Sequence, residues 1–280
     1  LGLAYGAFVQ NGQNLWVLAA ILMAIQTFRH LSDYNFSQVV KARAAEEIPV
    51  PVDFMAEWDG VTAQLEELDP EDDLAYAKKR IRFWLGKIVI FPIGERWLAI
   101  SVTAAVGGAL FTFTALPLLA LFSMVWVYRV RIAKTLAMAK TRIQSRVIAR
   151  QLDLGFSIKP VFTRFDWLEP SLLRALELGV IIALFAVTGN LEGNLGIASF
   201  VILFSIAFHH YDNLYRSMQN EGKPKWLSVM GLSAPGRIVL LAAFAFLGMN
   251  LSIPAAYFSV LFLALSSLQW VISHRIKPNV

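Results

Sequence analysis

Residues 171–212, SLLRALELGVIIALFAVTGNLEGNLGIASFVILFSIAFHHYD, decide the fold of this chain. Two apolar runs, 171–189 and 195–212, flank the polar sequence NLEGN at 190–194. Each run is close in length to the ~20 mostly apolar residues that cross a bilayer as a helix. The stretch therefore predicts two transmembrane helices joined by a tight hairpin turn.

The same pattern recurs along the chain and predicts an all-α, polytopic integral membrane bundle. Of the 280 residues, 57% are hydrophobic and 16% are charged, whereas soluble domains average about half apolar and a quarter charged. We place about seven complete spans, at 15–33, 96–114, 116–133, 171–189, 195–212, 237–250 and 253–273. Residues 1–9 read as the tail of another helix, so we expect the sequence to belong to a longer protein.

Prolines and polar residues mark the predicted span ends. Residues 112–117 read as a second tight hairpin turn. Pro117 and Pro254 each stand in the predicted first turn of a span, where the missing N–H costs nothing. The chain has no cysteine, which excludes disulfides and thiolate metal sites.

The distribution of Lys and Arg orients these spans. All 25 of these residues lie in four segments, 29–96, 129–174, 210–237 and 274–280. The connections that alternate with those segments, 10–14, 113–117, 189–195 and 249–253, contain none. Basic loops face the cytoplasm, so the C-terminus is predicted to be cytoplasmic. This bias also explains the net charge of +5 without a nucleic-acid partner.

The long cytoplasmic segment after the first span divides in two. Residues 46–73 are acidic and polar and predict a solvated loop. Residues 74–91, LAYAKKRIRFWLGKIVIF, place basic residues before a Trp-bearing apolar stretch, as in a helix that lies along the membrane surface. The alternative is ordinary positive-inside loop charge.

Two parts of the chain resemble each other. FRHLSDYNF at 28–36 matches FHHYDNLYR at 208–216, and 84–102 matches 226–244. Each copy ends in a helical hairpin. The sequence therefore predicts two membrane domains, 1–150 and 151–280, the second a degenerate repeat of the first. The alternative is convergent composition, since membrane helices resemble one another.

A polar cluster ends the first complete span. It comprises Arg29, His30, Asp33 and Tyr34, and Arg29 and Asp33 have the i,i+4 spacing of a helical ion pair. Ionisable residues near a membrane are functional candidates. The competing interpretation is a pair that fixes the helix to its neighbour.

A second candidate site is a cytoplasmic ring of cations formed by Lys87, Arg96, Arg129 and Arg131. Guanidinium groups offer paired donors that suit phosphate oxygens. The alternative is that these side chains are anchors that snorkel to the membrane surface.

We expect no metal site in this chain. His209 and His210 are adjacent, so they point to different helix faces and chelate poorly with Asp212. The sequence AEWDGVTAQ at 56–64 approaches the diphosphate-metal motif D-x2-D-G-x2-A-R, but Ala56 and Gln64 replace a needed Asp and Arg. Too few oxygen ligands remain there for a hard cation.

The first domain resembles the later half of the CDP-alcohol phosphotransferase family. The resemblance rests on LWVLAAILMAIQTFRHLSDYNF, on FWLGKIVIFPIGERW and on the hairpin at 96–134. It implies a bacterial plasma-membrane enzyme, commonly a homodimer, that transfers a phospho-alcohol from a CDP-alcohol to a hydroxyl acceptor. The region 150–280 resembles a C-terminal extension found on such proteins.

The resemblance also implies that this sequence holds only part of the family's active site. The family's paired Asp residues bind Mg²⁺, and they would lie before Leu1, so no catalytic residue is assigned within the chain. The acceptor-phosphate pocket carries over onto Lys87, Arg96, Arg129 and Arg131. One alternative function is a non-catalytic membrane scaffold or subunit of a larger complex. Another is a transporter, but no predicted span has the broken helix or the charged midplane that transporters use.

Overall fold

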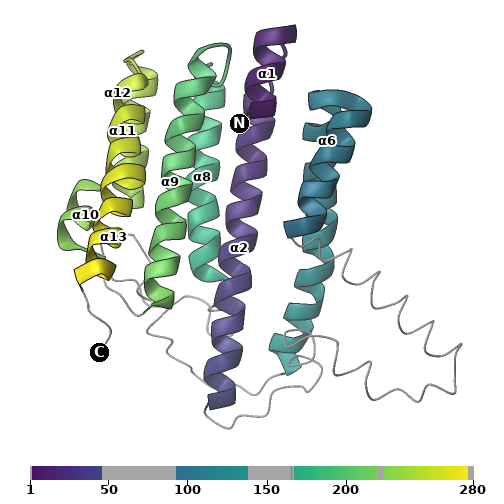
Figure 1. The fold of residues 1–280 in the computed structure, drawn as a ribbon, viewed down its shortest axis with the longest axis vertical. Helices are drawn as coiled ribbons and strands as arrows, with labels where there is room; N and C mark the ends of the chain where they lie inside the picture. The colour runs from purple at the N-terminus through teal and green to yellow at the C-terminus, as the bar shows by residue number, and fades with distance from the viewer. Residues whose placement is uncertain (1, 46–92, 138–164, 166, 220–222, 277–280) are drawn as a thin grey trace, which may run out of the picture. The chain divides into compact units, whose positions relative to one another are not determined.

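The computed structural model describes residues 2–45, 93–137, 165, 167–219 and 223–276, and every element in those ranges is a helix (Figure 1). The elements are α1 (Gly2–Asn11), α2 (Trp16–Ala45), α6 (Ile93–Ala137), α8 (Glu169–Val187), α9 (Leu195–Met218), α10 (Lys225–Met230), α11 (Ala234–Phe246), α12 (Ser252–Phe258), the π-helix η1 (Ser259–Leu265) and α13 (Ser266–Ile276).

Four helical stretches are long and apolar enough to cross a membrane: Leu98–Leu136, Glu169–Val187, Leu195–Met218 and Ser252–Ser273. The described elements confirm the all-helical prediction, and these four stretches are compatible with a membrane protein, while the count of about seven spans stays a prediction. The other apolar helix, α11, has 13 residues and extends about 20 Å, less than the ~30 Å hydrocarbon core. In α2 the apolar stretch ends at Gln26, where polar residues begin. Helix α2 is therefore not one of these four stretches of membrane-spanning length.

Helix α6 folds back on itself at a glycine. Its 45 residues would extend about 68 Å if straight. Gly108 has φ 67° and ψ −165°, outside the helical region, and Figure 1 shows two adjacent helical segments joined by a turn. Glycine takes positive φ without steric cost, and a side chain on the preceding Gly107 would collide with Phe111.

The predicted turn at 112–117 is therefore wrong, because Pro117 lies inside the helix. The predicted turn at 190–194 is confirmed, since it separates α8 from α9. Pro254 stands in the first turn of α12, as predicted. The loop at 46–73 and the surface helix at 74–91 lie outside the described residues.

The chain forms two compact units. The first combines Leu1–Phe36 with Ser145–Val280, and the second is Ser37–Gln144. The predicted division at residue 150 concerns sequence similarity between two halves, and it stays a prediction. In the first unit the N-terminal helices pack with the C-terminal half of the chain.

The core of the first unit is built around α9, which packs against α8 and against α12 and η1, while α8 also packs against α11. The buried side chains follow helical spacing on each element. They include Leu178, Ile181 and Phe185 of α8, Ile202, Leu203 and Ile206 of α9, Leu241 of α11, and Phe258 and Phe262 of α12 and η1.

Helix α2 is fixed to the α8–α9 hairpin at both ends. Near its start, the indole Nε1 of the buried Trp16 donates to the Gly193 carbonyl at 3.1 Å. Near its other end, Asn35 Nδ2 donates to Ser171 Oγ at 3.2 Å. The two contacts lie at opposite ends of α8, so α2 runs along its whole length.

Candidate functional site

Four buried ionisable side chains meet at one end of the first unit. Arg174 and Glu177 come from the beginning of α8, His210 from the last third of α9, and Arg237 from the first turn of α11. Their exposed fractions are 5%, 3%, 0% and 0%. Because α9 runs antiparallel to α8 and α11, all four lie at the end predicted to face the cytoplasm. We call them the buried ion-pair cluster.

Arg237 is held by two kinds of acceptor. Its Nε donates to Glu177 Oε1 at 2.6 Å and its Nη2 to Oε2 at 3.2 Å, a bidentate pairing. Its Nη1 donates to the carbonyls of Gly231 (2.9 Å) and Leu232 (2.7 Å). Leu232 has φ 55°, a conformation that costs a leucine about 1–2 kcal/mol. The guanidinium thus joins α8 to the strained turn that begins α11.

His210 connects Glu177 to Arg174. Its Nδ1 lies 2.6 Å from Arg174 Nη1, and its Nε2 lies 3.1 Å from Glu177 Oε2. A guanidinium can only donate, so Nδ1 must accept. The proton of the neutral imidazole then sits on Nε2, facing the carboxylate. These contacts tie α8, α9 and α11 together through charged and hydrogen-bonded groups.

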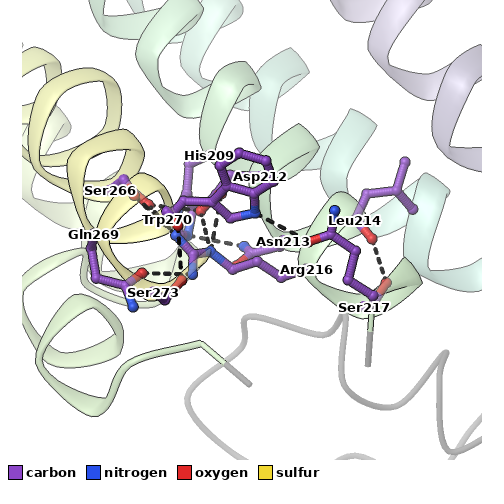
Figure 2. A network of polar contacts seen from close by, with 11 residues as sticks. His209, Asp212, Asn213, Leu214, Arg216, Ser217, Ser266, Gln269, Trp270 and Ser273 are labelled. Carbon is purple, nitrogen blue, oxygen red and sulfur yellow. Dashed lines mark hydrogen bonds and ion pairs between the residues drawn. The ribbon is translucent and has the colours of Figure 1, made fainter. Parts of the chain in front are cut away.

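A second polar network lies beside α13 (Figure 2). Both carboxylate oxygens of Asp212 accept from Arg216 Nε, at 3.0 and 2.9 Å, and Ser266 Oγ donates to Asp212 Oδ2 at 2.7 Å. Arg216 also donates to the Ser266 carbonyl at 3.0 Å and to Gln269 Oε1 at 2.7 Å. Arg216 is only 1% exposed, so this network joins the end of α9 to the last helix.

The predicted cluster at the end of the first span is a helix contact. Arg29 Nε and Asp33 Oδ2 lie 3.9 Å apart, which confirms the predicted i,i+4 pair. The His30 ring lies 4.9 Å from that of Tyr211 on α9. Burial raises the pKa of Tyr34, and a side-chain hydrogen bond with Ser217 opposes that shift. Two of the four residues thus face α9, as the packing interpretation requires.

The predicted cation ring is only partly described. Lys87 lies outside the described residues, and of Arg96 only the backbone, in the first turn of α6, is described. Arg129 is exposed, while Arg131 is half-buried with its guanidinium 5.9 Å from the Tyr128 ring centre. Residues two apart on a helix do not face each other, so Arg129 and Arg131 do not grip one phosphate from a single face. The ring stays a prediction.

The described residues contain no group of three His, Cys, Asp or Glu side chains placed to hold a metal. His209 stacks on Phe262, with ring centres 4.1 Å apart, and its Nε2 lies 3.1 Å from Asn213. His210 instead faces Glu177. The adjacent histidines therefore point to different partners, as predicted from helix geometry. The near-match at 56–64 lies outside the described residues.

The buried ion-pair cluster is not among the residues predicted from the sequence, although the sequence carries a signal for it. Arg174 and Glu177 stand at i,i+3 inside an otherwise apolar run, and charges within a span mark either function or a buried partner. Arg237 was assigned to the positive loops because it lies at a span end. Its 0% exposure shows instead that it points into the bundle.

One comparison with known proteins gives a match. Residues 95–279 match the model of a family of unknown function, DUF5941. The match covers nearly all of α6 and the whole α8–α13 region, and therefore both polar networks described above. No curated protein and no solved structure matches the chain.

Proposed function

The chain belongs to the DUF5941 family, and we propose that it is the membrane-embedded part of a CDP-alcohol phosphotransferase-like enzyme. It would transfer a phospho-alcohol from a CDP-alcohol to a phosphorylated hydroxyl acceptor, of phospholipid or inositol-phosphate type. The proposal places the chain in a bacterial plasma membrane with about seven spans, a cytoplasmic C-terminus and a possible homodimeric state. The Mg²⁺ implied by the family would be held by residues outside this chain.

The observation that carries the proposal is α6, the element within the resemblance to the family. After α2 with its polar end, α6 folds back at Gly108 into a helical hairpin, as the resemblance implies. An exposed arginine, Arg129, stands near the end of its second segment. Such a guanidinium can bind the phosphate of an acceptor through paired hydrogen bonds. The four apolar stretches of spanning length, of which Leu98–Leu136 contains the fold-back of α6, are compatible with a polytopic membrane protein, and the count of about seven spans is part of the proposal.

The second candidate is a non-catalytic scaffold or subunit of a larger membrane complex. It is favoured by the buried ion-pair cluster, in which Arg237 donates to Glu177 and to backbone carbonyls and His210 lies against Glu177. Within the α8–α13 region these contacts stabilise helix packing. We therefore assign no chemistry to that region.

A CMP-release assay decides between the two. Membranes containing the natural full-length protein are given CDP-diacylglycerol and inositol phosphate, with Mg²⁺ or with EDTA. The enzyme proposal expects Mg²⁺-dependent CMP release. It also expects Arg129→Ala to raise the KM for the acceptor by about 10- to 150-fold, since a charged hydrogen bond contributes about 1.5–3 kcal/mol.

Lys134→Ala is the matched control, because Lys134 lies on the same helix as Arg129 but on a different face and outside the predicted cation ring, so it should leave KM unchanged. Absence of CMP release with a panel of CDP-alcohols, together with stable co-purification of other membrane proteins, would overturn the enzyme in favour of the scaffold.

A further inference from the structure

An apolar groove of about 440 Å³ lies between α10 and the last helix of the first unit. Its apolar walls are the side chains of Trp226, Met230, Leu265, Leu268 and Ile272. The volume lies within the ~300–1,000 Å³ of ordinary ligand pockets. Leu268 is 55% exposed, so a ligand can enter from the side of the bundle.

The short helix α10 is fixed in place as one wall of this groove. Tyr257 Oη donates to the Met230 carbonyl at 2.6 Å and ties the end of α10 to α12. The remaining wall belongs to η1 and α13, whose Trp270 Nε1 donates to Gln219 Oε1 at 3.2 Å. The groove is thus built by packed helices rather than by a loop.

The groove has a polar edge formed by Gln269 and Ser273. Gln269 Oε1 accepts from Arg216 Nη1 at 2.7 Å (Figure 2), and Arg216 is buried. An amide has its NH₂ opposite its oxygen. Since the oxygen faces Arg216, the NH₂ group is directed away from it, as a donor for an acceptor at the groove edge.

A basic residue adjoins the groove lining along the chain. Lys225 is exposed and directly precedes Trp226 on α10. This end of the bundle is the one predicted to face the cytoplasm, where the membrane surface carries anionic lipids. Tryptophan is also enriched at that depth, where its ring meets the headgroup layer.

We propose that the groove binds one molecule of an anionic phospholipid from the cytoplasmic leaflet. An acyl chain fills the apolar walls, Lys225 pairs with the headgroup phosphate, and the Gln269 amide donates to a phosphate or ester oxygen. The proposal requires membrane insertion but no enzymatic activity, so it stands whether the chain is an enzyme or a scaffold.

Native mass spectrometry tests the site on the full chain. The protein, in a zwitterionic detergent, is incubated with phosphatidylglycerol or with phosphatidylcholine of the same acyl composition. We expect one phosphatidylglycerol to be retained per chain, with about fivefold preference over phosphatidylcholine, the factor expected for one basic residue at an anionic group.

Two variants separate the acyl and headgroup contacts. Leu268→Trp fills the groove and should abolish retention of both lipids, whereas Lys225→Gln should remove only the preference for phosphatidylglycerol. The matched controls are Leu118→Trp, which changes a side chain that is 68% exposed on α6, and Lys134→Gln, and both should behave as the unmodified protein does. Equal retention of the two lipids by the unmodified chain, or unchanged retention in Leu268→Trp, would overturn the proposal.

Discussion

The pair of Glu177 and Arg237 gives the sharpest prediction about stability. Removing either partner leaves a charge that the bundle buries without compensation, since Glu177 is 3% and Arg237 0% exposed. Breaking a buried pair in this way costs about 3–5 kcal/mol. We therefore expect Glu177→Leu and Arg237→Met each to lower the free energy of unfolding by roughly that amount.

The double variant should be far less damaged than the sum of the two, because it contains no unpaired charge. Replacing a buried ion pair by apolar residues is often neutral or stabilising. Some cost remains, since the carbonyls of Gly231 and Leu232 lose their bonds to Arg237 and the His210 Nε2–H loses the Glu177 carboxylate. Each unsatisfied buried group costs about 1–3 kcal/mol, which the gain of about 1–4 kcal/mol from replacing the ion pair partly offsets. We expect a net loss of about 2–5 kcal/mol for Glu177→Leu/Arg237→Met, instead of the ~6–10 kcal/mol that additivity of the single losses gives.

The assay is equilibrium unfolding in mixed detergent–lipid micelles, titrated with SDS and followed by circular dichroism. Glu192→Gln is the control, because this carboxylate is exposed in the turn between α8 and α9. Even an exposed ion pair contributes only about 0–1 kcal/mol. Additive losses in the double variant, or single losses as small as that of the control, would refute the assignment of the cluster as a stabilising ion pair.

Two further substitutions test the packing of the first unit by the same unfolding measurement. A methyl group on Gly196 would collide with the Trp16 indole, so Gly196→Ala should lower the free energy of unfolding by about 1–3 kcal/mol. The control Gly179→Ala lies in the open middle of α8 and should be neutral or stabilising. Equal effects of the two substitutions would contradict this packing. Arg216→Lys keeps the positive charge but loses the guanidinium hydrogen bonds that reach Asp212 and α13 at the same time. It should therefore lower the free energy of unfolding by about 1.5–3 kcal/mol. A loss below ~0.5 kcal/mol would show that the charge alone is enough to hold α9 and α13 together.

Much of the fold follows from apolar run length and turn sequence. The α8–α9 hairpin is predicted because NLEGN interrupts two runs of membrane length. The predicted α6 turn is misplaced because Pro117 is the stronger helix-breaking signal in this part of the sequence. In the structure the chain turns instead at Gly108, which adopts a positive φ. A lone Gly-Gly pair in an apolar run carries little signal.

The sites were harder to predict, because a charge near a span end has two interpretations. Arg237 and Arg129 each stand near the end of a predicted span, yet Arg237 is buried against Glu177 and Arg129 is exposed. The difference depends on which residue of a neighbouring helix lies opposite, and that pairing is tertiary information. The partner of Arg237 is 60 residues away along the chain.

A membrane bundle with its basic connections on the cytoplasmic side can be tested directly through the accessibility of its two ends. The chain has no cysteine, so single cysteines can be labelled without background. Glu192→Cys, in the turn between α8 and α9, and Ser228→Cys, on α10, are treated with a membrane-impermeant maleimide in intact spheroplasts and again after lysis. We predict that the cysteine at 192 is labelled in intact cells and that at 228 only after lysis. Labelling of both before lysis, or the reverse pattern, would contradict the account.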